Sequence, residues 1–134
     1  MKMNLRDEHG FSLIEVLLAV TIIGLIAAAA VPKAAHVMAV SRTQRVIADL
    51  QTLDAAVVMY ETEKGTPPKA ITDLSDYVRS IDKVKPPQGS TIVVGSSEEN
   101  VTEASYTLSD KGTDGIRATL GSYTSDDLLP GAKQ

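Results

Sequence analysis

The feature that most constrains this chain is an apolar run that contains one carboxylate. The chain reads GFSLIE at residues 10–15, and after Glu15 there is no charged residue until Lys33. Residues 11–31 are long enough, as a helix, to cross about 30 Å of hydrocarbon. A charged side chain inside a bilayer costs about 2–3 kcal/mol on insertion scales, so Glu15 needs a positively charged partner.

A cut after Gly10 would supply that partner, because the new α-amine of Phe11 would be largely cationic at neutral pH. Residues 1–10 (MKMNLRDEHG) are short and polar, and their basic and acidic side chains balance. An ordinary secretory signal has its apolar core before the cleavage site, whereas here the apolar core follows it. Cleavage would therefore remove a leader on the cytoplasmic side and leave the membrane anchor on the product.

This arrangement resembles the class III signal of type IV prepilins and pseudopilins. The resemblance rests on the polar leader, the GFSLIE sequence and the apolar run, and it extends more loosely to about residue 64. It implies that a membrane prepilin peptidase cleaves after Gly10 and N-methylates Phe11. It also implies that Glu15 pairs with the Phe11 amine of a neighbouring subunit during assembly. An uncleaved signal-anchor helix with an isolated glutamate is the alternative.

Gly24 and Pro32 are candidate positions for a helix break. Pro32 lacks the backbone N–H that would bond to the carbonyl of Ala28, so it predicts a kink or a local break. It also marks the end of the apolar run. The resemblance implies that residues 24–32 lose helicity within an assembled filament.

Beyond Pro32 the sequence becomes amphipathic. Apolar residues recur at intervals of four and three, which places them on one face of a helix. They are Val46, Leu50, Leu53, Val57 and Tyr60. Gly65 and the two prolines after it predict the end of this helix. We therefore expect one helix over about residues 11–63, with a transmembrane or filament-core half at 11–32 and an amphipathic half at 33–64.

Residues 65–134 predict a linking segment, a small antiparallel sheet and an irregular C-terminal tail. A short helix is expected over residues 70–81, with Thr72 as its N-cap. Three β-prone runs, at 91–94, 105–108 and 116–120, are separated by polar turns and predict an antiparallel meander. The expected fold class is α+β, with a long N-terminal α-helix and a small antiparallel β-sheet domain packed on its C-terminal half, as in type IV pilins.

Composition excludes several classes of function. The chain has no cysteine, so it lacks the disulfide that often closes the C-terminal loop of pilins, and the soluble part depends on packing. A net charge of −4 gives no broad attraction to nucleic acid. One phenylalanine and four tyrosines disfavour an electron-carrying filament. The sequence shows no catalytic constellation or phosphate-binding loop, so an enzyme is not expected.

Four aspartates near the C-terminus are weak candidates for a calcium site. Their oxygens could bind one Ca²⁺ if the tail folds back near the turn at 109–115. They are Asp110, Asp114, Asp126 and Asp127. Major pseudopilins of type II secretion carry calcium in their C-terminal loops, but the aromatic-rich segment of those loops is missing here. Solvated turn residues are the alternative, and no other cofactor is expected.

The expected function is a structural subunit of a type IV pilus. It would be stored in the inner membrane and polymerised into a surface filament for adhesion, motility or DNA uptake. The implied partners are copies of itself in a helical homopolymer, minor pilins, the prepilin peptidase, an assembly ATPase and an inner-membrane platform protein. A pseudopilin of a type II secretion system or competence pseudopilus is the alternative within filaments. Outside filaments, the alternative is a monomeric membrane-anchored binding protein.

Overall fold

The computed structural model describes residues 10–131. The expected leader at 1–10 lies outside these residues except for Gly10, and so do the last three residues of the tail. The chain divides into two compact units, a first unit at Met1–His36 and a second unit at Val37–Gln134. Residues 16–31 of the first unit carry no charge, whereas the second unit combines charged residues with buried apolar ones.

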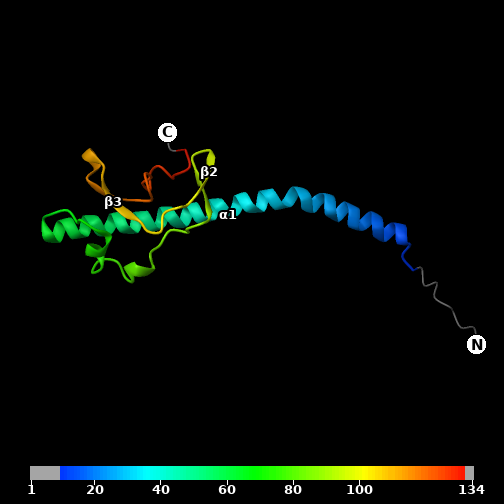
Figure 1. Cartoon of the computed structure of the whole chain (residues 1–134), viewed down its shortest axis with the longest axis horizontal. Helices are drawn as coiled ribbons and strands as arrows, with labels where there is room; N and C mark the ends of the chain where they lie inside the picture. The colour runs from blue at the N-terminus through cyan, green and yellow to red at the C-terminus, as the bar shows by residue number, and fades with distance from the viewer. Residues whose placement is uncertain (1–9, 132–134) are drawn as a thin grey trace, which may run out of the picture. The chain divides into compact units, whose positions relative to one another are not determined.

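The expected long helix is confirmed as α1 (Leu13–Lys64), which is 52 residues long and runs from blue to green in Figure 1. The carbonyl of Ser12 accepts the first backbone bonds of the helix. At the other end Gly65 adopts a φ of +70°, and its N–H donates to the carbonyl of Glu61 at 2.8 Å. Glycine is the residue best suited to this left-handed C-terminal position, so the sequence locates the end of α1 within one residue.

The helix is unbroken at Gly24 and Pro32. The local break that Pro32 predicts is therefore absent from the single chain. Pro32 removes one backbone donor only, and the alanines that precede it are strong helix formers. The loss of helicity over residues 24–32 concerns an assembled filament and stays a prediction.

The strands of the described residues form two separate antiparallel pairs instead of one meander. β1 (Thr91–Val94) pairs with β2 (Ser97–Asn100), and β3 (Thr107–Asp110) pairs with β4 (Ile116–Thr119). The expected antiparallel pairing is confirmed, whereas the single sheet of three runs is wrong. All four side chains of β2 are exposed, so this strand shows no apolar alternation from which the sequence could predict it.

The outer edge of β1 explains why the two pairs stay apart. The hydroxyl of Thr43 on α1 accepts the backbone N–H of Val93 at 2.7 Å and lies 3.4 Å from the carbonyl of the same residue. Because Thr43 occupies these backbone groups, they are not available to a further strand.

The helix expected over residues 70–81 is also wrong. Two short 3₁₀ helices replace it, η1 (Ile71–Leu74) and η2 (Ile81–Lys83), and the N-cap of η1 is Ala70 instead of Thr72. Ser80 adopts a φ of +58°, which is incompatible with a continuing right-handed helix.

Asp73 supplies a local reason for the short turn. One oxygen of its carboxylate accepts the backbone N–H groups of Lys69 and Ala70, at 2.9 and 3.0 Å. Aspartate in this position satisfies backbone donors by itself and so competes with a regular α-helix.

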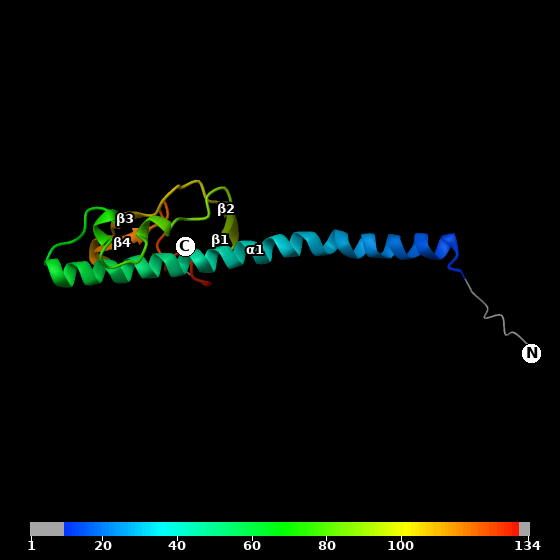
Figure 2. The ribbon, with the colours of Figure 1, turned by 90° about the horizontal axis from the view of Figure 1, so that it is seen from below.

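The core of the second unit lies between α1 and the strands, which run alongside the teal and green part of the helix in Figures 1 and 2. The predicted apolar face of the helix, called the stripe below, is confirmed, since Val46, Leu50, Leu53 and Val57 are at most 2% exposed. Tyr60 packs at the edge of the stripe. The stripe packs against Leu74, Val78, Ile92, Val94, Val101, Tyr106, Ala118, Leu120 and Leu128. Each fully buried aliphatic side chain contributes about 1.5–3 kcal/mol, so this unit has a core of its own.

Candidate functional site

The junction between Gly10 and Phe11 lies outside α1 and is exposed. Phe11 is 87% exposed. A Cβ atom built on Gly10 would meet no heavy atom within 4 Å, and the backbone there is not left-handed. The fold of the described chain would therefore tolerate a side chain at position 10, and it gives no structural reason for a glycine.

Glu15 has a partner in its own chain that the sequence reasoning missed. Its Oε2 accepts the backbone N–H of Ser12 at 2.8 Å. Ser12 is the N-cap of α1 and Glu15 is its third residue, so this contact is the carboxylate half of a capping box. The helix dipole also favours a negative charge in the first turn. The Ser-x-x-Glu spacing at 12–15 is the sequence signal for this cap.

The second oxygen of the Glu15 carboxylate takes no part in the helix cap. Oε1 makes no hydrogen bond or ion pair with any residue in the range 10–131. The neighbouring side chains are apolar and exposed, with Leu13 at 90% and Ile14 at 67%. The carboxylate therefore caps its own helix with one oxygen and presents the other on an apolar surface.

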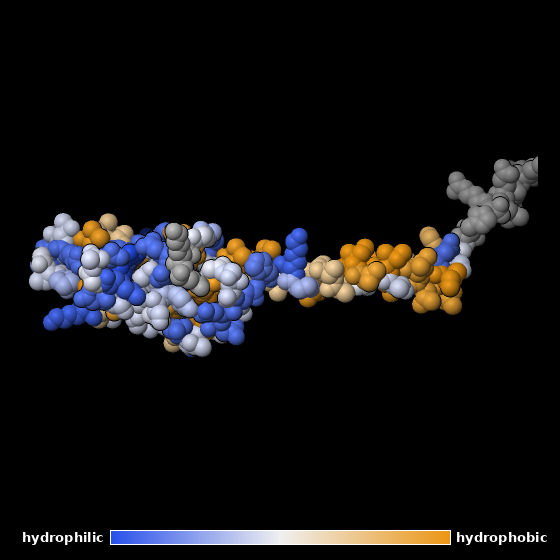
Figure 3. All heavy atoms as spheres, turned by 90° about the horizontal axis from the view of Figure 1, so that it is seen from above, coloured by the Kyte–Doolittle hydropathy of each residue, from blue (hydrophilic) through white to orange (hydrophobic). Residues whose placement is uncertain are grey.

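Residues 16–31 form an exposed, mostly apolar surface, which is largely orange and tan in Figure 3. Its most apolar 18-residue window has a mean hydropathy of 2.6, and none of that window is buried. The hydroxyl of Thr21, inside this run, donates to the carbonyl of Leu17 at 2.7 Å and so needs no outside partner. Length and composition both suit a membrane span.

Two polar side chains of α1 attach neighbouring segments of the second unit to the helix. Thr43 bonds to β1 through Val93, as described above. Asp49 accepts the hydroxyl of Tyr106 at 2.9 Å. Burial, together with the nearby Asp49 carboxylate, raises the pKa of Tyr106, so its hydroxyl stays protonated and donates.

Asp54 makes a third and larger attachment. Its Oδ1 accepts the N–H of Ala118 at 2.7 Å, and its Oδ2 lies 2.9 Å from both Nε and Nη2 of Arg117. Arg117 also donates to Asp126 at 3.1 Å and to the hydroxyl of Ser125 at 3.0 Å. The bond to Asp54 raises the pKa of Arg117. One carboxylate thereby connects α1, β4 and the C-terminal segment.

The sequence carries a weak signal for these attachments. Asp49 follows Val46 by three residues, and Asp54 follows Leu50 by four, so both lie beside the buried stripe. Acidic residues in that position face the packed domain. Their partners cannot be identified from the sequence, because Arg117 lies 63 residues beyond Asp54.

The two C-terminal calcium candidates are engaged in other contacts. Asp126 bonds to Arg117, and Oδ2 of Asp127 accepts both the N–H and the hydroxyl of Thr124 at 2.8 Å. The backbone bond from Thr124 is the main reason that the pKa of Asp127 lies below its usual value. Both carboxylates therefore stabilise the C-terminal segment.

The other two candidates lie beside the short 3₁₀ helix η3 (Gly112–Asp114). Asp110 accepts the N–H of Gly112 at 2.8 Å, and Asp114 is exposed at the end of η3. Over residues 10–131, no three His, Cys, Asp or Glu side chains form a group that could hold a metal ion. The calcium expectation has no geometric support in this part of the chain and stays untested.

Comparison with known protein families identifies a motif at the N-terminal end of the chain. Residues 5–31 match the family model of the prokaryotic N-terminal methylation motif. The match includes Gly10, Phe11 and Glu15 and most of the apolar run, and it includes none of the second unit. No curated protein and no solved structure matches the chain.

Proposed function

We propose, from the class III signal of type IV pilins and pseudopilins at residues 5–31, that this chain is a structural subunit of a type IV filament. It is made as a precursor whose apolar helix lies in the inner membrane. The proposal rests on three features that follow one another along the chain. They are an exposed Gly10–Phe11 junction, Glu15 in the first turn of α1, and the uncharged apolar surface after it.

The exposed junction is the cleavage site of a prepilin peptidase. It precedes α1, so the peptidase can bind residues 10 and 11 without unwinding the helix. Since the fold itself does not require glycine at position 10, the glycine is explained by the fit of the chain to the peptidase. Cleavage frees the amine of Phe11, and the same enzyme N-methylates it.

Glu15 then directs assembly. Its Oε2 stays on the N–H of Ser12, and its Oε1 receives the cationic Phe11 amine of a neighbouring subunit. In an apolar environment a charge that loses its partner is destabilised by about 3–5 kcal/mol, so a subunit docked in register is favoured over one that is not. The exposed apolar side chains of residues 16–31 bundle with those of other copies and form the filament core.

We propose a pilus with roles in adhesion, motility or DNA uptake, assembled by an ATPase and an inner-membrane platform protein and joined by minor pilins. The alternative is a pseudopilus of a secretion or competence system. Filament length distinguishes them, because long filaments on the cell surface support the pilus and short periplasmic ones support the pseudopilus.

Variants at Glu15 test the assembly step. Glu15→Gln keeps an oxygen for the N–H of Ser12 but removes the charge, whereas Glu15→Val removes both. Each variant should insert into the membrane normally, and each should lower the yield of sheared filaments more than about tenfold, because the amine is left without a partner.

Thr21→Val is the matched control, since it removes a polar group from the same apolar run whose bond lies within its own helix. Its filament yield should equal that of the wild type. Normal filament yield from Glu15→Gln would show that the charge pair does not drive assembly, and loss in Glu15→Val alone would assign the role of Glu15 to the helix cap.

A further inference from the structure

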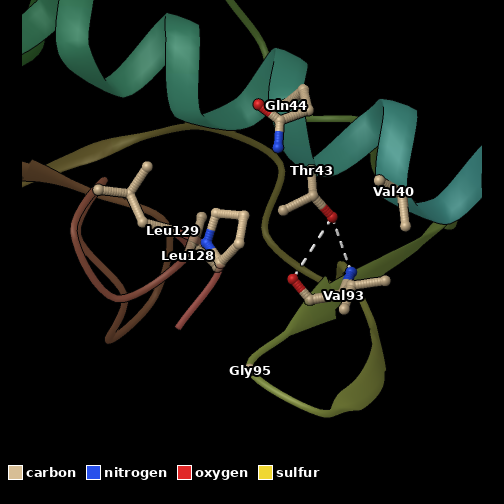
Figure 4. Close-up of a pocket in the computed structure, with 8 residues that line it drawn as sticks. Val40, Thr43, Gln44, Val93, Gly95, Leu128 and Leu129 are labelled. Carbon is tan, nitrogen blue, oxygen red and sulfur yellow. Dashed lines mark hydrogen bonds between the residues drawn. The ribbon is translucent and has the colours of Figure 1, made fainter. Parts of the chain in front are cut away.

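The second unit contains an apolar groove that the assembly step above does not use. It lies where α1, the β1–β2 turn and the C-terminal segment meet, as Figure 4 shows, and its volume is about 200 Å³. Its apolar walls are made by Val40, Val93, Leu128, Leu129 and Pro130.

The groove offers little to a polar ligand. The hydroxyl of Thr43 accepts the N–H of Val93 at 2.7 Å (Figure 4). It also donates to the carbonyl of Ala39 at 3.0 Å, so its bonding capacity is used within the unit. Gln44 is the other polar side chain in the lining, and among residues 10–131 no charged side chain lines the groove. An apolar and uncharged occupant fits this chemistry.

The groove continues onto the exposed surface of the helix. Val37 lies one turn before Val40, so both are on the same face of α1. Val37 is 59% exposed, Val40 37% and Leu129 38%. Contiguous apolar surface of this kind on a folded domain marks a docking site.

We infer that this groove receives apolar side chains from the uncharged half of α1, residues 16–31, of a second copy of the chain. The inference rests on the proposed function and adds to it the surface that receives the helix. Residues 16–31 carry no charge, and the most apolar part of α1 is wholly exposed in the single chain. A charged partner would lose hydration in the groove without gaining a counter-charge. This helix segment has no charge to desolvate, so it does not incur that cost.

The geometry of the two surfaces also fits a growing polymer. The groove lies on the second unit and the helix surface on the first, so each copy carries one surface of each kind. Contact between unlike surfaces is heterologous, and a heterologous contact that does not close into a ring extends into a filament. A symmetric dimer would instead require the same surface on both partners.

A photoreactive benzoylphenylalanine in place of Leu129 tests the contact directly. The full chain would be expressed with its assembly machinery, irradiated in cells, and the filament fraction analysed by mass spectrometry. We expect covalent dimers and higher multimers in which the partner peptide comes from residues 16–31. The same residue in place of Ser122, which is exposed in a turn away from the groove, should give no such adduct.

Adducts to lipid alone, to a different protein, or to a peptide of the second unit would each overturn the inference. So would a product that stays monomeric in filaments that have assembled normally. Each of the three adducts would also identify the molecule that occupies the groove instead.

Leu129→Glu gives an independent readout. It should lower the filament yield about tenfold while the amount of cleaved subunit in the membrane stays unchanged, and Ser122→Glu should have no effect. If the wild-type chain forms no filament with its own machinery, the proposed function itself fails. If the wild type and Leu129→Glu assemble equally and Leu129 gives no adduct with residues 16–31, only the groove assignment fails.

Discussion

Asp54 stabilises the second unit, which has no disulfide because the chain contains no cysteine. The side chains of Asp54 and Arg117 are only 17% and 20% exposed, so the pair is largely shielded from water. Asp54→Ala leaves the guanidinium and the N–H of Ala118 without their acceptor. We expect a loss of about 2–4 kcal/mol in the free energy of unfolding, measured by urea unfolding of the detergent-solubilised chain.

Asp126 provides the matched control, because it bonds to the same arginine but is 65% exposed. An exposed ion pair contributes at most about 1 kcal/mol, so Asp126→Ala should have a much smaller effect. Equal losses in the two variants would contradict the central role given to Asp54.

Asp127 gives the C-terminal segment a dependence on pH. Its pKa lies below the ordinary value of 3.8, chiefly because it accepts the N–H of Thr124. A lowered pKa contributes stability that is complete above the ordinary value and is lost as the pH falls through the lower folded-state value. Asp127→Ala should therefore reduce the free energy of unfolding by about 1 kcal/mol at pH 7, and the difference from wild type should shrink toward pH 2. A difference that grows on acidification would contradict the assigned direction of the Asp127 pKa shift.

Individual residues differ in how far the sequence identifies them. Gly10, Phe11 and Glu15 are found from the sequence because their meaning depends on spacing within six residues. The Ser12 cap of Glu15 is equally local, since it lies within a Ser-x-x-Glu spacing, although the sequence prediction did not include it. The partners of Asp49 and Asp54 depend on contacts over 57 and 63 residues, which no local pattern encodes.

Helices and strands, like single residues, can be located from the sequence where a local pattern marks them. The stripe on α1 and the alternation of Ile92 and Val94 in β1 report burial on one face, so both elements are located from the sequence alone. β2 has no buried side chain and gives no such signal. The outer edge of β1 is bonded to Thr43, a helix residue 50 positions earlier, and no local pattern predicts this contact.

Thr43 is therefore expected to fix β1 on the helix. Thr43→Val keeps the shape of the side chain but leaves the N–H of Val93 without an acceptor, at a cost of about 1–3 kcal/mol. Thr43→Ser keeps the hydroxyl and should lose less. Amide hydrogen exchange at Val93 would report the change, and an exchange rate in Thr43→Val equal to that of the wild type would contradict the assignment.

The whole chain is organised as an apolar anchor and a domain with its own core. Every residue of the core cluster lies between Val46 and Leu128, in the second unit. A chain that begins at Val37 should therefore be soluble, melt cooperatively and run as a monomer in size-exclusion chromatography, because it lacks the apolar helix surface that we propose joins copies. A molten or aggregated product would show that the domain depends on the apolar half of α1.

The central claim is that residues 5–31 form a processed signal, and the N-terminus of the membrane-stored protein tests it most directly. Gly10→Val, which the fold tolerates, should block processing and provides the control. Mass spectrometry of the wild-type chain, purified from membranes that contain a prepilin peptidase, should show a protein that begins with N-methylated Phe11. A wild-type product that retains residues 1–10 would contradict the account.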